Sequence, residues 1–268
     1  WFPLFVNPQI EPSFYYLIYR TLFRHFIMDY SIFDVRECNV RYKILPDGTV
    51  VEKLVCNQKI WHPTGELRYK EPKNKIKSTS GDNTSRSIRR AKNSIYDYVI
   101  CNADLDLFVT LTLNKDVIDR YDYKAIIKKL NQWLDNRVRR NGLKYVIVPE
   151  LHKNGAIHFH GFLNKDCCKL VDSGHKYKDG RTIYNIKDYK LGFTDCMVTV
   201  GERSKIANYI CKYITKQADT GKIGGRFYLH SNNLLIPSYE YGVEDFNTDD
   251  GYEFAIDGTS RKFKKTTL

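Results

Sequence analysis

Hydrophobic and polar positions alternate with a period of two in several short segments of the chain, a pattern typical of β-strands with one buried face. The first two segments are residues 40–44 and 50–55, and turn-forming residues separate them at 46–48. Residues 105–113 are rich in Phe, Val and Thr, which favours a further strand. Four later segments also predict strands: 144–150, 156–163, 193–200 and 226–230.

Three segments instead have apolar residues spaced as on one face of a helix. The first begins with Thr84 or Ser85 as its cap. Its apolar face consists of Ile88, Ala91, Ile95 and Val99. The second covers residues 122–140 and ends at Gly142, and the third covers residues 203–216. The second is expected to turn four side chains inward: Ile127, Leu130, Leu134 and Val138.

The order of these elements is β-α-β-β-(insertion)-β-α-β, with residues 165–192 as an irregular insertion. This order predicts an α+β fold, an antiparallel sheet with helices on one face, of the RRM-like kind. Residues 84–240 would form this domain. Residues 1–83 would be an N-terminal extension with short strands and a basic linker, and residues 241–268 an acidic and then basic C-terminal tail.

Met28 is the first methionine of the chain, which begins with Trp1. Residues 1–27 are rich in aromatic side chains and interrupted by prolines, so they lack the continuous apolar stretch of a secretory signal. We expect Met28 to be the biological start and residues 1–27 to be translated upstream sequence.

The composition points to a folded protein with a polyanionic partner. The 268 residues include 43 Lys and Arg against 31 Asp and Glu, a formal net charge of +12. Hydrophobic residues make up 42% of the chain, too many for a disordered protein. No uninterrupted apolar stretch is long enough for an ordinary membrane-spanning helix. The charge therefore indicates nucleic acid, with an anionic membrane surface as the lesser alternative.

The positive charge is concentrated in residues 68–92, which hold nine basic residues and two acidic ones. A run such as 68–77 is explained equally well as a solvated surface. In the first predicted helix, however, the basic residues lie opposite the apolar face, so that the helix can lie against phosphates. These residues are Arg86, Arg89, Arg90 and Lys92.

The seven cysteines are an odd number and form no CxxC pair, which argues against a disulfide framework or a four-cysteine zinc site. Reduced thiols of a cytosolic protein fit better. One set could in principle converge on zinc, namely Cys167, Cys168, His175 and Cys196.

Two histidines form the first candidate site. His158 and His160 are two residues apart in a predicted strand, so both imidazoles project from one face. Glu150 lies in the preceding strand, across a turn, and a hairpin can place it beside them. Two imidazoles and a carboxylate suit a metal with open positions for a phosphate oxygen. The alternative is a pair of structural strand histidines.

A doubled Tyr-x-x-Lys pattern forms the second candidate site, on the third predicted helix. Tyr209, Lys212, Tyr213 and Lys216 occupy an arc of roughly 100° on that helix. A phenol with a pKa of about 10 is a poor nucleophile at neutral pH, so nearby cations or a metal would be needed to favour the phenolate. An amphipathic helix with interfacial tyrosines is the alternative explanation.

Together these motifs resemble those of the HUH (His–hydrophobe–His) rolling-circle replication initiators. The strand at 108–112, the His158-Phe159-His160 motif and the tyrosine helix follow one another in the order found in that family. The resemblance covers about residues 84–240. It is closest to initiators of bacterial single-stranded DNA phages, which are microvirus-like, and of Gram-positive plasmids or integrated elements.

The resemblance implies that His158 and His160 bind Mg²⁺ or Mn²⁺, with Glu150 as the third ligand. The substrate would be single-stranded or hairpin origin DNA. Because the chain contains no G-x-x-x-x-G-K-[ST] phosphate loop, it would depend on a host helicase, and on a host polymerase, in the cytoplasm of a bacterial cell.

The resemblance also assigns roles to the second motif. Tyr209 or Tyr213 would attack the scissile phosphate, leaving a 5′-phosphotyrosine link and a free 3′-OH primer, and the other tyrosine would cut the regenerated origin. Lys212 and Lys216 would position the phosphate or offset its charge. If only one tyrosine acts, the Lys-Tyr-x-x-Lys context slightly favours Tyr213.

Two other functions stay open at this point. A conjugative relaxase or a tyrosine transposase would use the same chemistry. A non-enzymatic RRM-like nucleic-acid-binding module would use the basic helix and an aromatic sheet surface instead. Geometry separates the enzyme from the binding module, because an enzyme requires Glu150, His158 and His160 together, with Tyr213 on the same side.

Overall fold

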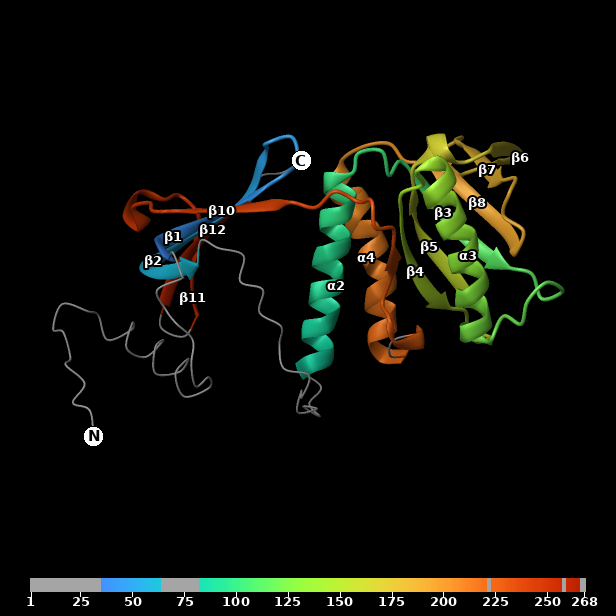
Figure 1. Ribbon diagram of the computed structural model, residues 1–268, viewed down its shortest axis with the longest axis horizontal. Coiled ribbons are helices and arrows are strands. Elements are labelled where there is room, and N and C mark those ends of the chain that lie inside the picture. Colours follow the sequence, from blue (N-terminus) through green and yellow to red (C-terminus); the bar gives the residue numbers. More distant parts are fainter. Residues whose placement is uncertain (1–34, 64–81, 221–222, 257–258, 266–268) are drawn as a thin grey trace.

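The computed structural model describes residues 35–63, 82–220, 223–256 and 259–265, and in these residues the chain forms two antiparallel sheets and three α-helices (Figure 1). This is the predicted α+β class. The predicted upstream segment 1–27 and the basic run 68–77 lie outside the described residues. Within the described part, no helix is both long and apolar enough to cross a lipid bilayer.

The larger sheet has seven strands in the order β6-β7-β8-β3-β5-β4-β9. Its strands are β3 Leu107–Leu113, β4 Tyr145–Leu151, β5 Ile157–Leu163, β6 Leu170–Lys176, β7 Thr182–Ile186, β8 Gly192–Val198 and β9 Leu229–His230. The predicted strands are therefore present, although the one expected at 226–230 keeps only its last two residues.

One face of this sheet is covered by α3, Tyr123–Asn141 (Figure 1). Ile126, Leu130 and Leu134 are fully buried there, against strand residues such as Phe159. The sequence pattern placed Ile127 inward, but Ile127 is only half-buried and Ile126 takes its place. Two adjacent isoleucines fit the helical period almost equally well, and the contact with the sheet decides between them.

The ends of α3 show why it forms where the sequence predicts. The Asp122 carboxylate accepts a hydrogen bond from the backbone N–H of Ala125 at 3.1 Å, which caps the first turn. Gly142 follows the last turn with a φ of 70°, a left-handed conformation that glycine adopts without steric cost.

The opposite face of the sheet carries α2, Asp82–Cys101, and α4, Arg203–Thr220, side by side (Figure 1). The apolar residues of the two helices pack on Val146, Val148 and Phe162. The expectation of helices on one face only is therefore corrected, because α3 lies on the other. The start of α2 is also corrected, since it begins at Asp82 rather than at a cap on Thr84 or Ser85; polar residues in a first turn carry no periodic signal.

The predicted irregular insertion at 165–192 is instead ordered, and this expectation was wrong. After a short 3₁₀ turn, Lys165–Cys167, strands β6 and β7 form a hairpin that extends the large sheet beyond β8. Most side chains of β6 are exposed, so the segment lacks the alternation by which the other strands are found in the sequence.

The smaller sheet has five strands in the order β10-β1-β2-β12-β11. They are β1 Val35–Ile44, β2 Val50–Pro63, β10 Ser238–Gly242, β11 Tyr252–Ile256 and β12 Thr259–Lys265. The segment 241–268, predicted as a tail, therefore contributes strands that pair with the N-terminal ones. Its acidic run is not a solvated tail because Lys53 on β2 forms ion pairs with Glu244 at 2.5 Å and Asp249 at 2.6 Å.

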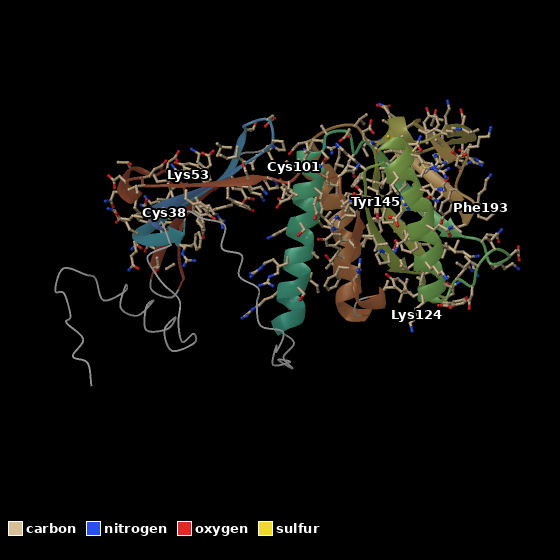
Figure 2. All side chains as sticks on the ribbon, in the orientation of Figure 1. Cys38, Lys53, Cys101, Lys124, Tyr145 and Phe193 are labelled. Atoms are coloured by element: carbon tan, nitrogen blue, oxygen red, sulfur yellow. The ribbon has the colours of Figure 1, made fainter. Side chains whose placement is uncertain are left out.

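The smaller sheet packs against the end of α2. Leu45 and Val51 form an apolar contact with Ile100 and Cys101, and Figure 2 shows Cys101 at the end of α2 nearest this sheet. An ion pair between the Lys43 ammonium and the Asp97 carboxylate lies beside this contact. The two sheets are thus connected through α2.

Candidate active site

The two histidines project from β5 toward α4. Ile157 and Phe159 of β5 are buried on the α3 side, and by strand alternation His158 and His160 face the other side. In the register of the sheet, His158 is paired with Glu150 on β4. The hairpin thus places the carboxylate where the sequence predicts it.

The histidines and Glu150 form a closely connected cluster with two threonines. The Glu150 Oε2 atom lies 2.7 Å from Nε2 of His160, and their side chains are 16% and 12% exposed. On β3, the hydroxyl of Thr110 lies 3.1 Å from Nδ1 of His160, and that of Thr112 lies 3.3 Å from Nδ1 of His158. Each ring thus has its Nδ1 edge held by a hydroxyl, which leaves Nε2 as the atom available for a ligand.

The His158 imidazole is held in its neutral form. Burial lowers its pKa to about 4, with further lowering by His152 and His160, while Glu150 acts in the opposite direction. The ring of His152 stacks on His158 with centroids 3.8 Å apart. Neutral imidazole is the form that binds metals. The sequence places His152 in a turn and gives it no role in the site, so this contact is an addition from the structure.

Helix α4 places both tyrosines over this cluster. The Tyr213 ring stacks on the His160 ring, with centroids 4.2 Å apart and 12° between the planes. The Tyr213 hydroxyl donates to the Tyr209 hydroxyl at 3.3 Å. The Lys212 ammonium lies 5.3 Å from the centroid of the Tyr209 ring. Lys216 lies in α4 as predicted, but its side chain lies outside the described residues.

The two phenols differ in their surroundings. Burial raises the pKa of Tyr213, and the hydrogen bond to Tyr209 and the charge of Glu150 raise it further. Tyr209 is 44% exposed and has an edge-on contact with Phe108 on β3. The Tyr213 phenol is therefore strongly held in its protonated form, whereas Tyr209 is open to solvent.

Comparison with known families now adds a finding from outside the geometry. Residues 106–218 match the family described as Replication-associated protein ORF2/gene 2 protein. The match supports a replication initiator of the Rep type. Neither the curated proteins nor the solved structures give a match.

The Rep-type segment contains the whole cluster: Glu150, His158, His160, Tyr209 and Tyr213. It begins just before β3 and ends within α4, so it takes in the central strands of the large sheet and α3. The smaller sheet and α2 lie outside the matched residues. The family match and the local geometry therefore point to the same part of the molecule.

The donor set of the cluster suits a divalent cation. Two imidazoles with fixed Nδ1 edges and a carboxylate on the neighbouring strand are typical ligands. In the described residues, however, no three His, Cys, Asp or Glu side chains are already arranged as a metal site. Glu150 and His160 contact each other directly, so binding a cation between them requires Oε2 of Glu150 to leave Nε2 of His160.

The cysteine set considered for zinc does not form a site in the described residues. All seven cysteines are free thiols, as expected. Burial raises the pKa of both Cys168 and Cys196 to about 12, which keeps them protonated and unsuited to bind a metal.

The predicted DNA-binding residues lie on the exposed side of α2. Arg86, Arg89 and Arg90 are exposed and Lys92 is half-buried, while the opposite side of the helix packs on the sheet. Lys92 and Lys212 line one cleft of about 590 Å³, between α2, α4 and the smaller sheet. Lys92 is thus connected with the tyrosine helix through a shared surface.

Proposed function

We propose that the protein initiates rolling-circle replication by nicking and rejoining single-stranded or hairpin origin DNA. The observation that carries this proposal is the stacking of Tyr213 on His160, with Glu150 in contact with the same imidazole. A nucleophile and a set of phosphate-activating ligands thus meet on one face of the sheet. The family match supports the replication role but not, by itself, this chemistry.

The proposed reaction is a transesterification. A tyrosine oxygen attacks the scissile phosphorus and loses its proton as the new O–P bond forms. The bond from phosphorus to the 3′-oxygen breaks, and that oxygen takes up a proton to become the 3′-OH primer. The 5′-phosphate remains on the tyrosine, and the reverse reaction with a 3′-OH reseals the strand.

Glu150, His158 and His160 would hold Mg²⁺ or Mn²⁺. Such a cation, when bound, supplies a Lewis acid for the phosphate oxygens. The hydroxyls of Thr110 and Thr112 hold the imidazoles in the orientation that this requires.

Tyr209 is our candidate for the first nucleophile. It is the more exposed phenol, and the hydrogen bond donated by Tyr213 would stabilise its phenolate. Lys212 adds a positive charge near its ring. The sequence context instead favours Tyr213, so the two variants separate these assignments. Lys216 would act with Lys212 on the phosphate charge, as the resemblance implies.

The remaining partners follow from the products. A free 3′-OH is a primer, so a polymerase and a helicase of the host would extend and unwind the strand, in the cytoplasm of a bacterial cell. A relaxase or transposase would use the same site chemistry on a different DNA. A non-enzymatic binding module gives no reason for the contacts among Glu150, His160 and Tyr213.

Covalent capture tests the proposal. The full chain is incubated with a randomised pool of single-stranded oligonucleotides and Mn²⁺, and a protein–DNA adduct is sought on a denaturing gel. We expect an adduct with the wild type and with Tyr252→Phe, which changes an exposed tyrosine of β11. The double variant Tyr209→Phe/Tyr213→Phe should form none. An adduct that persists in the double variant would refute the proposed nucleophiles.

A further inference from the structure

A cavity of about 480 Å³ opens beside Tyr209, on the same face of the sheet as the histidines. Its floor includes Phe108 and Phe162 of the central strands, and one wall is α4 with Tyr209. The facing wall is the β6–β7 hairpin, which contributes Tyr177 and Ile183. We call this cavity the hairpin pocket. It is therefore completed by the segment that the sequence presents as an insertion.

The hairpin pocket combines apolar walls with a few polar groups. Asp195 lines it from β8, directly opposite Thr110 in the sheet register. Arg181 lines it from the turn before β7, and its guanidinium is fixed by Asp179 at 2.5 Å and by the carbonyl of Val198 at 3.3 Å. Mostly apolar walls with a small number of placed polar groups are typical of sites for small, flat ligands.

The position of Tyr209 limits what this ligand can be. The same side chain lines the hairpin pocket and hydrogen-bonds to Tyr213 over the histidines. A nucleotide whose phosphate reaches the Tyr209 oxygen therefore has its base within reach of the pocket. Phe193, exposed on β8 two residues before Asp195, offers a further stacking surface along the same strand (Figure 2).

We propose that the hairpin pocket holds one unpaired base of the DNA, next to the scissile phosphate, and that Asp195 selects a base with an exocyclic amino group. This inference rests on the function proposed above. Aromatic side chains stack on the face of any base, whereas a carboxylate accepts a hydrogen bond from the amino group of cytosine or adenine and discriminates against thymine.

Sequencing of captured DNA tests the assignment. The oligonucleotide pool is reacted as above, and both the attached and the released fragments are sequenced. With the wild type we expect one position beside the cut to favour an amino-bearing base. Asp195→Asn replaces an acceptor-only group with one that also donates, so the preference at that position should fall by about tenfold or more. Ile183→Ala should weaken capture by opening the pocket wall.

The controls are matched variants in the same insertion. Asp166→Asn makes the same charge change at an exposed site outside the hairpin pocket, and Val171→Ala shortens an exposed side chain of β6. Both should keep the wild-type preference. If Asp195→Asn captures DNA with an unchanged preference at every position, the base-pocket assignment is wrong.

A second measurement separates this inference from the proposed function. The same pool is bound without Mn²⁺, and the retained strands are sequenced. If no adduct forms but a base preference is still abolished by Asp195→Asn, the pocket assignment stands and the nicking proposal falls. If neither an adduct nor an Asp195-dependent preference appears, both are refuted.

Discussion

At the scale of single residues, the orientation of the histidines is set by side chains that have no chemistry of their own. The hydroxyls of Thr110 and Thr112 face Nδ1 of His160 and His158 across the β3–β5 pairing. This leaves both Nε2 atoms toward the cluster with Glu150. Hydrogen bonds of this kind fix the tautomer and the direction of a ligating imidazole.

Removing these hydroxyls should weaken cation binding. We expect the double variant Thr110→Val/Thr112→Val to bind Mn²⁺ about tenfold or more weakly, because the imidazoles lose their fixed orientation. Titration followed by electron paramagnetic resonance of free Mn²⁺ measures this directly. Thr182→Val on β7 is the control, with affinity expected at the wild-type level. Equal affinity in the double variant would show that the threonines do not position the ligands.

Much of the residue-scale site follows from sequence because its geometry is local. Strand alternation puts His158 and His160 on one face, and a single short turn brings Glu150 to them. The contacts of Thr110 and Thr112 depend instead on the register of β3, far away in the chain, which periodicity does not determine. The stacking of His152 on His158 could not be inferred either, since turn residues carry no facing pattern.

At the scale of elements, the predicted pattern was strongest where one face is fully buried. α3 and α4 are found by their apolar stripes, and β3 to β5 by alternation. The β6–β7 hairpin was missed because most of its side chains are exposed, and Gly174 interrupts β6 with a φ of 77°. That hairpin nevertheless forms one wall of the hairpin pocket. Exposed strands give little signal even when they shape a site.

The close approach of β4 and β5 makes a specific demand at Gly161, the residue after His160. A Cβ atom there would lie 2.2 Å from the carbonyl oxygen of Val146 and 2.7 Å from Cα of Ile147. We expect Gly161→Ala to destabilise the fold by about 1–3 kcal/mol, because backbone atoms must move. Urea unfolding measures this. Gly242→Ala, whose Cβ meets only Val40 at an ordinary 3.5 Å, should change stability little.

At the scale of the whole molecule, the chain returns to its own beginning. Strands β10, β11 and β12 from the C-terminal part complete the small sheet with β1 and β2. Sequence reasoning separated these segments as an extension and a tail, because pairing between strands some 200 residues apart leaves no local trace. The charged residues that suggested a tail serve instead in ion pairs such as Lys53–Asp249.

This closure creates the basic cleft between the two sheets. Arg41 and Lys265 of the small sheet line it together with Lys92 of α2 and Lys212 of α4. The net charge of +12 thus includes a cluster next to the proposed nucleophiles, drawn from segments outside the matched family region. Such a cleft suits a phosphate backbone entering or leaving the site.

The cleft leads to a prediction about salt dependence. We expect Arg41→Ala/Lys92→Ala to weaken binding of single-stranded DNA and to reduce the slope of log affinity against log salt by about 0.7 for each phosphate that is no longer neutralised. Fluorescence anisotropy with a labelled oligonucleotide across a salt series measures the slope. Lys124→Ala removes an exposed charge on α3, on the other face of the large sheet (Figure 2), and should leave the slope unchanged. If the double variant keeps the wild-type slope, the DNA backbone does not follow this cleft, and the small sheet has another role.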